Sequence, residues 1–100
     1  MTMEFEFDAT KDKKNRKKHG LSLDFAAELD WNVMVTRVDD DHGEERWFGI
    51  APGKGQLYSI VFSIREEQKG KQPDEIVRPI SLRRATKPEE QEYGKKIRKR

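Results

Sequence analysis

The sequence predicts an α+β domain: a small antiparallel sheet with two N-terminal helices on one face and a short C-terminal helix. Segments of alternating apolar and polar residues, joined by turns rich in Gly and Pro, dominate the second half of the chain. Two capped helical segments follow a first short strand. The expected order is therefore strand, helix, helix, four strands and helix, with consecutive strands pairing antiparallel.

Composition indicates one domain with a lean core. The chain has 100 residues, of which 33% are hydrophobic and 40% are charged, and it contains no cysteine. Disulfides and thiolate chemistry are therefore excluded. We expect one domain over 1–94 and a basic tail over 95–100. The N-terminus does not resemble a signal peptide and no apolar segment approaches ~20 residues, so a cytoplasmic protein without membrane contact is expected.

The charges are segregated along the chain. Residues 11–18 hold six cations and one acid, 39–45 hold five acids, and 95–100 hold five cations. This pattern favours a polyanionic partner on some surfaces and a basic partner on another.

The N-terminal part begins with alternation of apolar and acidic residues over 3–8, which predicts a short, half-buried strand. Asp8 then suits the N-cap of a helix over 9–19, and Gly20 suits its C-terminal stop. The helix is almost entirely polar, with Lys11, Asn15 and Lys18 on one side. That side must lie against charged or hydrogen-bonding groups, because so polar a helix is rarely stable alone.

A second helix is predicted from the N-cap Ser22 to about Leu29, followed by a strand over 31–38. The acidic turn over 39–43 includes His42 and invites a metal-site interpretation. We reject that interpretation, because adjacent acids in a hairpin turn are more often exposed to solvent and no second ligand cluster accompanies them.

Two further strands are predicted over 44–51 and 57–65. In the first, Glu44, Arg46, Phe48 and Ile50 share a face. Glu44 and Arg46 are either a strand-end ion pair or an acid and a cation at the rim of a site. In the second, alternate residues from Tyr58 to Ile64 form an unbroken apolar face.

A hydrophilic loop over 66–74 precedes a last strand that begins at Ile76. Alternation places Ile76, Ile80 and Leu82 on one face of this strand, and Val77, Ser81 and Arg83 on the other. Pro79 cannot donate a ladder hydrogen bond, which predicts a sheet edge or a bulge. The last helix is expected over 87–93, capped by Thr86 and ended by Gly94.

Three groups of residues resemble motifs of the BrnT family of bacterial toxins. The first comprises Phe7, Asp8, Lys11, Asn15, Lys18, His19, Gly20, Phe25 and Ala27; the second spans 43–47 with Gly49; the third spans 80–86 with Glu89 and Tyr93. They occur in order and at suitable spacing across most of the chain.

This resemblance implies a fold similar to the RelE ribonucleases and a toxin of a type II toxin–antitoxin pair. It implies RNA cleavage that inhibits translation and needs neither metal nor other cofactor. A BrnA-like ribbon-helix-helix antitoxin would neutralise the toxin, and the complex would contact operator DNA through the antitoxin.

The motif positions imply Glu44, Arg46 and Arg83 as catalytic residues, joined by His19. Without a metal, the 2′-hydroxyl of RNA attacks the neighbouring phosphate, so the protein must move protons and stabilise negative charge. We expect Arg46 and Arg83 to converge on the phosphate, while either Glu44 or His19 transfers a proton. The candidates for binding flanking RNA are Lys18, Arg65, Arg84, Trp47 and Tyr93.

Blander interpretations remain for these residues. Arg83 and Arg84 can be solvated charges that end a strand, the lysines can be a solvated helix face, and Trp47 can belong to the core. The alternative function is a non-catalytic module that binds nucleic acid or protein, in which the basic helix supplies salt-dependent affinity.

Overall fold

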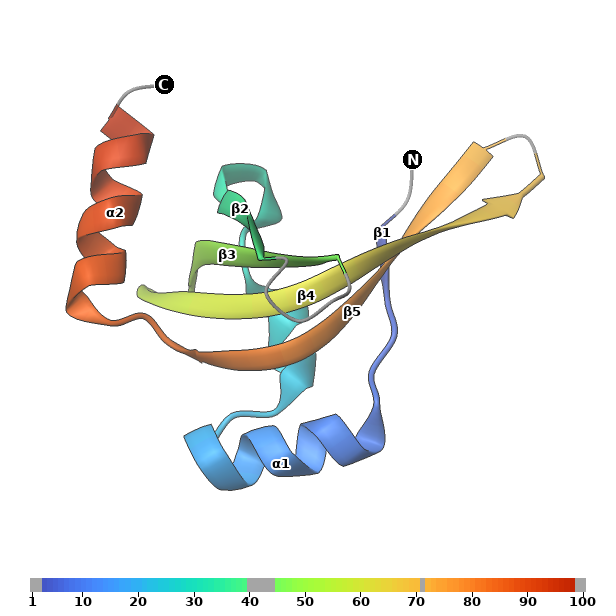
Figure 1. Ribbon diagram of the computed structural model, residues 1–100, viewed down its shortest axis with the longest axis horizontal. Helices are drawn as coiled ribbons and strands as arrows, with labels where there is room; N and C mark the ends of the chain where they lie inside the picture. The colour runs from blue at the N-terminus through green and yellow to red at the C-terminus, as the bar shows by residue number, and fades with distance from the viewer. Residues whose placement is uncertain (1–2, 40–44, 71, 99–100) are drawn as a thin grey trace.

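The structure is a computed structural model that describes residues 3–39, 45–70 and 72–98 (Figure 1). Its elements follow in the order β1 (Met3–Phe5), α1 (Ala9–His19), the 3₁₀ helices η1 (Leu23–Glu28) and η2 (Trp31–Val33), β2 (Val35–Asp39), β3 (Arg46–Gly53), β4 (Gln56–Lys69), β5 (Gln72–Arg84) and α2 (Lys87–Arg98). The α+β class is confirmed, but the two N-terminal helices do not share one face of the sheet as predicted: η1 packs on one face, whereas α1 lies along the edge of β5. None of the helices within the described ranges is both long and apolar enough to cross a membrane.

The five strands form a mixed sheet in the order β1-β5-β4-β3-β2. The four strands from β2 to β5 pair antiparallel with their neighbours in sequence, as predicted. The prediction of a purely antiparallel sheet is wrong, because β1 pairs parallel with β5 through Met3–Glu75, Glu4–Ile76 and Phe5–Val77. A parallel pair needs a long crossover connection, and here the whole chain between β1 and β5 supplies it.

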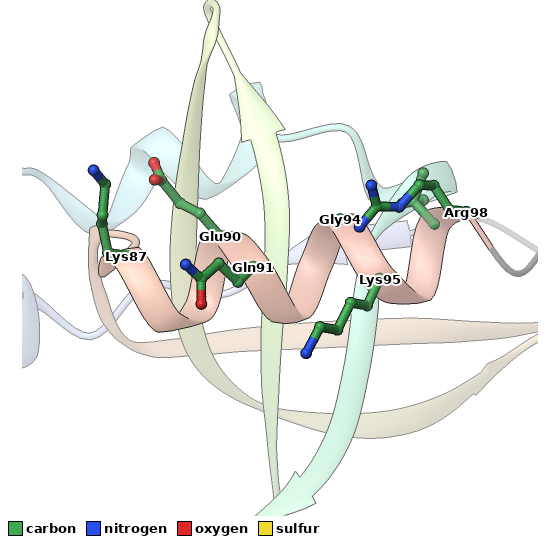
Figure 2. Close-up of a pocket in the computed structure, with 7 residues that line it drawn as sticks. Lys87, Glu90, Gln91, Gly94, Lys95 and Arg98 are labelled. Atoms are coloured by element: carbon green, nitrogen blue, oxygen red, sulfur yellow. The ribbon is translucent and has the colours of Figure 1, made fainter.

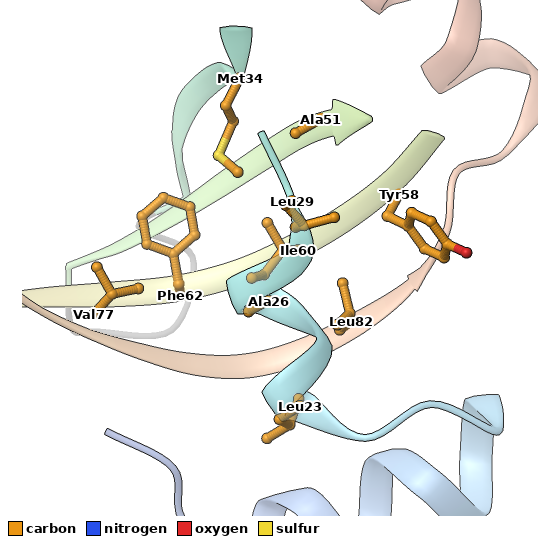
Figure 3. Close-up of a cluster of buried hydrophobic side chains, with 10 residues drawn as sticks. All are labelled: Leu23, Ala26, Leu29, Met34, Ala51, Tyr58, Ile60, Phe62, Val77 and Leu82. Carbon is orange, nitrogen blue, oxygen red and sulfur yellow. The ribbon is translucent and has the colours of Figure 1, made fainter. Parts of the chain in front are cut away.

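One face of the sheet, the core face, carries Tyr58, Ile60 and Phe62 from β4 and packs against η1 and the segment that follows it (Figure 3). Leu23, Ala26 and Ile60 are completely buried there. The indole of Trp31 donates from Nε1 to the carbonyl of Ala26 at 2.8 Å, which ties η2 to η1. The opposite face, the second face, carries Arg46, Phe48 and Ile50 from β3, as alternation predicted.

Local structure between α1 and β2 differs from the prediction. Ser22 caps the second helix as expected, with its hydroxyl accepting from the amide of Asp24, but the helix is 3₁₀ rather than α. Trp31–Val33 is a further 3₁₀ turn, so the strand begins only at Val35. Trp31 is β-prone by type, yet its ring packs edge-on against Phe62 with centroids 5.0 Å apart, and this burial outweighs the local preference.

The predicted loop over 66–74 is instead the end of a long ribbon formed by β4 and β5, which extends well beyond the neighbouring strands (Figure 1). The register also shifts next to Val61 and Phe62, whose partners are Ser81 and Pro79, so that Ile80 is the extra residue of a bulge. The bulge at Pro79 is confirmed, and β5 is also an edge of the sheet there, because its pairing with β1 stops at Val77. The bulge also reverses the alternation, so Val77 rather than Ile80 joins Leu82 in the core.

The prediction that Gly94 ends the last helix is wrong, because α2 continues to Arg98 and includes Lys95 and Lys96. Thr86 is the N-cap as predicted: its hydroxyl accepts from the amide of Glu89 at 3.4 Å, and Glu89 Oε1 accepts from the amide of Thr86 at 2.9 Å. Gly94 lies on the side of α2 that faces away from the sheet, near Glu90 and Gln91 (Figure 2).

Gly94→Ala is expected to raise the free energy of unfolding by about 1 kcal/mol, because alanine favours the helix interior over glycine by that amount. A Cβ at this position would meet no atom within 4 Å. Gly20→Ala is the opposite control, since Gly20 closes α1 with φ +72° and a side chain is strained there. Urea titration should move the two midpoints in opposite directions; a midpoint lowered by Gly94→Ala would contradict the prediction.

Candidate functional site

The second face is bordered by both long helices. α1 lies beside β5, and α2 crosses the β3–β2 side of the sheet, where Glu92 approaches the guanidinium of Arg37 at 3.4 Å and Tyr93 Oη donates to the carbonyl of Val33 at 3.1 Å. Arg37 in turn lies 4.2 Å from the centre of the Phe48 ring. The two helices therefore leave a strip of the second face between them.

Asn15 fixes α1 against β5. Its amide accepts from the backbone N–H of Leu82 at 3.0 Å and donates to the carbonyl of Leu82 at 2.8 Å and to that of Leu21 at 2.9 Å. The side chain thus satisfies the backbone N–H and C=O of Leu82, at the edge of β5 where β1 has ended. It replaces the hydrogen bonds that a neighbouring strand would make. This confirms that the polar side of α1 lies against hydrogen-bonding groups, and it turns the lysines on either side of Asn15 toward the second face.

A cavity of about 370 Å³ lies along this junction. It is lined by Lys11, Lys14, Asn15, Lys18, His19, Arg46, Ile80 and Ser81. Three of the predicted site residues, Lys18, His19 and Arg46, therefore come together, although α1 and β3 are distant in sequence. With three lysines, one arginine and one histidine, and no carboxylate among the described residues that line it, this basic cavity suits an anion rather than a metal cation.

His19 is the one titratable imidazole among the described residues that line the basic cavity. Partial burial and the neighbouring charges of Lys18 and Arg83 all lower the pKa of its imidazole below the usual value. At neutral pH the ring is therefore largely neutral and able to accept a proton.

Arg83 shares the second face with Arg46 but does not line the basic cavity. Its Nη1 and Nη2 donate to Glu89 Oε1 and Oε2 at 2.7 and 2.9 Å. Glu89 Oε1 also accepts from the hydroxyl of Ser59 at 2.8 Å. These hydrogen bonds hold the pKa of Glu89 at about 2, with Arg83 as the largest cause, and raise the pKa of Arg83. Arg83 therefore joins β5 to the first turn of α2.

The family model described as ribonuclease toxin, BrnT, of type II toxin-antitoxin system matches residues 7–89. The chain belongs to the BrnT family. No curated protein matches it. Membership makes the chain a ribonuclease toxin by family, with RNA as its target and an antitoxin as its partner.

The remaining residues that we expected in the BrnT site lie elsewhere. Arg84 donates to Gln56 Oε1 at 2.6 Å, Arg65 pairs with Glu6 at 2.8 Å, and Tyr93 bonds to Val33 as described above. Trp47 is on the core face, where it packs against the buried cluster. None of these four lines the basic cavity.

Glu44 lies outside the described residues, as do Asp40, Asp41 and His42 of the acidic turn. Over the ranges that are described, no group of three or more His, Cys, Asp and Glu side chains is arranged to hold a metal ion.

Sequence reasoning missed two contributions to this site. Lys11 and Lys14 line the cavity and were not assigned to it, although their spacing with Lys18, over three and seven residues, places all three on one side of a helix. Glu89 was noted only as a motif residue. The spacing Thr86-x-x-Glu89 indicates a capping box, in which the Glu89 side chain binds the amide of Thr86. The neighbouring sequence does not indicate that the same carboxylate also binds Arg83.

Proposed function

We propose that this BrnT toxin cleaves RNA without a metal ion, and that the scissile phosphate binds in the basic cavity between α1 and β3. The observation that carries the proposal is the convergence of Arg46, Lys18 and His19 on one cavity. The resulting cut in messenger RNA, in the cytoplasm, would inhibit translation. A ribbon-helix-helix antitoxin would neutralise the toxin and carry most contacts to operator DNA.

In the proposed reaction, the 2′-hydroxyl attacks the adjacent phosphorus while a base removes its proton. The bond to the 5′-oxygen breaks, and that oxygen receives a proton, which leaves a 2′,3′-cyclic phosphate and a free 5′-hydroxyl. Arg46 and Lys18 stabilise the charge that develops on the phosphate oxygens. His19 suits the base, because its lowered pKa keeps it neutral at pH 7. Glu44 remains the other candidate.

Arg83 enters this proposal through the effect of its charge on the pKa of His19. Because Glu89 binds both of its terminal nitrogens, a phosphate would have to compete with that carboxylate for the guanidinium. We assign the direct phosphate contact to Arg46 first, because Arg46 lines the basic cavity and Arg83 does not. Arg83 supports the positive potential near His19 and holds α2 in place.

The lysines of α1 provide the test. Lys14→Ala with Lys18→Ala removes two cations from the cavity lining, whereas Lys13→Ala with Lys17→Ala removes two exposed lysines of the same helix that do not line it. We expect the first pair to weaken binding of a labelled RNA at least about 10-fold and to reduce the salt dependence by about two counterions, because each lysine lost removes one phosphate contact. The second pair should have a much smaller effect.

The same proteins should be assayed for cleavage in EDTA. Cleavage by the wild type and by the Lys13/Lys17 variant, with loss in the Lys14/Lys18 variant, would support a metal-independent enzyme at this cavity. Equal behaviour of the two variants would rule the cavity out. RNA binding without cleavage in any buffer, including buffers with Mg²⁺, would favour the non-catalytic module.

A further inference from the structure

A second surface, on the core face, is apolar and exposed. Among the described residues, the large hydrophobic side chains with substantial exposure are Met3, Phe7, Val38 and Ile64, at 41%, 41%, 52% and 41%. A chain with only 33% hydrophobic residues has few to leave in water, so their location matters. Three of the four lie on the core face.

Strand register shows that these residues are neighbours. Phe5 of β1 pairs with Val77 of β5, which pairs with Ile64 of β4, so one row crosses three strands. Val38 pairs with Trp47, which pairs with Phe62, in a second row. Directly opposite residues share a face, and both rows contain buried core residues.

Aromatic rings connect the two rows. Trp31 lies 5.0 Å from Phe62 and 5.7 Å from Phe5, and Phe5 stacks on Phe7 at 5.9 Å. We call the set Met3, Phe5, Phe7, Trp31, Val38, Trp47 and Ile64 the aromatic patch. Of these seven residues, Phe5, Trp31 and Trp47 are partly buried against the core cluster, and the other four are exposed.

The rim of the aromatic patch is acidic. Glu66 and Glu75 pair directly on the core face, one step beyond the row of Phe5, Val77 and Ile64, and Met3 pairs with Glu75. Like charges directly opposite each other destabilise a sheet. Within the described part of the chain, no cation forms an ion pair with either carboxylate. A cationic group from another molecule would relieve this repulsion.

We propose that the aromatic patch is the docking surface for a basic, amphipathic segment of the antitoxin. The proposal rests on the proposed toxin–antitoxin function. Apolar side chains of the segment would cover Phe7, Val38 and Ile64, and its Lys or Arg side chains would pair with Glu66 and Glu75. The acidic rim excludes RNA from this patch, just as the cations of the basic cavity, on the opposite side of the sheet, exclude such a segment from the cavity.

Two adjacent residues of β4 give the test a matched control. Glu66 lies on the core face and Glu67 on the other, so Glu66→Lys and Glu67→Lys make the same charge change on opposite sides of the ribbon. Binding of the full-length antitoxin of the same operon, purified separately, should be measured for both variants and for Ile64→Lys. We expect Ile64→Lys to weaken binding at least about 10-fold, because it places a cation in the apolar centre of the surface. Glu66→Lys should slow association and weaken binding more than Glu67→Lys does.

Equal affinities of Glu66→Lys and Glu67→Lys, together with an unaffected Ile64→Lys, would overturn the proposal. So would a toxin dimer in the absence of antitoxin that Ile64→Lys converts to a monomer, since a second copy would then be the occupant. All three substitutions replace exposed residues that do not line the basic cavity, so RNA cleavage by the free variants should match the wild type. If the wild type does not cleave RNA, the proposed function fails but the binding comparison still decides this inference.

Discussion

Arg46→Ala is expected to lower the rate of RNA cleavage about 10²- to 10³-fold, the usual effect of removing one fixed donor from a developing negative charge. Among the residues that line the basic cavity, Arg46 is the one that contributes a guanidinium, and it reaches the cavity from β3 while the lysines come from α1. Binding of intact RNA should fall much less, because Lys11, Lys14 and Lys18 remain. Single-turnover cleavage of a labelled RNA in EDTA separates the two effects.

Arg16→Ala is the matched control for Arg46. Arg16 lies on α1 but pairs with Asp12 at 3.0 Å and is not among the residues that line the cavity, so its loss should leave cleavage nearly unchanged. Arg46→Lys keeps the charge without the planar fork and should recover only part of the rate. Cleavage by Arg46→Ala at the rate of the wild type would remove Arg46 from the mechanism.

Local signals in the sequence were sufficient for the elements that carry most of the site. α1 begins and ends as predicted, because Asp8 accepts from the amides of Thr10 and Lys11 and Gly20 adopts a left-handed conformation. Alternation also predicted correctly that Arg46 shares a face with Phe48 and Ile50, and that Arg83 lies on the face opposite Leu82. These features depend on residues a few positions apart, and the sequence displays such relations directly.

The errors arose where distant residues decide the structure. The parallel pairing of β1 with β5 and the bulge at Ile80 depend on contacts across most of the chain, and the bulge exchanged the faces of Val77 and Ile80. Hydrophilic composition suggested a loop over 66–74, yet backbone pairing continues there despite Glu66 facing Glu75. Hydrophilic residues indicate that a segment is exposed to solvent, but they do not distinguish an exposed pair of strands from a loop.

The same limit applies to the site residues. The resemblance to the BrnT family grouped Arg46, Arg83 and His19 as site residues, but it did not indicate the partner of Arg83. An arginine at the end of a strand offers no local indication of whether it meets a phosphate or a carboxylate. In the structure, Arg83 binds the carboxylate of Glu89. A substitution at Arg83 therefore changes the stability of the protein as well as any contact with phosphate.

Glu89→Ala is accordingly expected to lower the free energy of unfolding by about 2 kcal/mol at pH 7. The carboxylate binds Arg83 through both oxygens, Ser59 and the amide of Thr86, so its removal leaves a partly buried guanidinium without its partner. The side chain of Glu89 is 14% exposed, and solvent screening keeps the effect below that of a fully buried pair. Urea titration of Glu89→Ala beside Glu90→Ala, an exposed acid one position along α2, isolates the contribution. Equal midpoints for the two variants would contradict the role assigned to Glu89.

The stabilisation contributed by Glu89 should also depend on pH, which provides a second test of its role. The pKa of Glu89 falls from 4.5 to about 2 on folding, so the folded state favours the ionised form. The stabilisation is complete above pH 4.5 and disappears as the pH falls toward 2. The difference between wild type and Glu89→Gln should therefore be constant from pH 6 to 8 and shrink through that acidic range. An Arg83→Ala variant would lose the same stabilisation, so a loss of cleavage in that variant counts as evidence for a phosphate contact only where the protein is shown to remain folded.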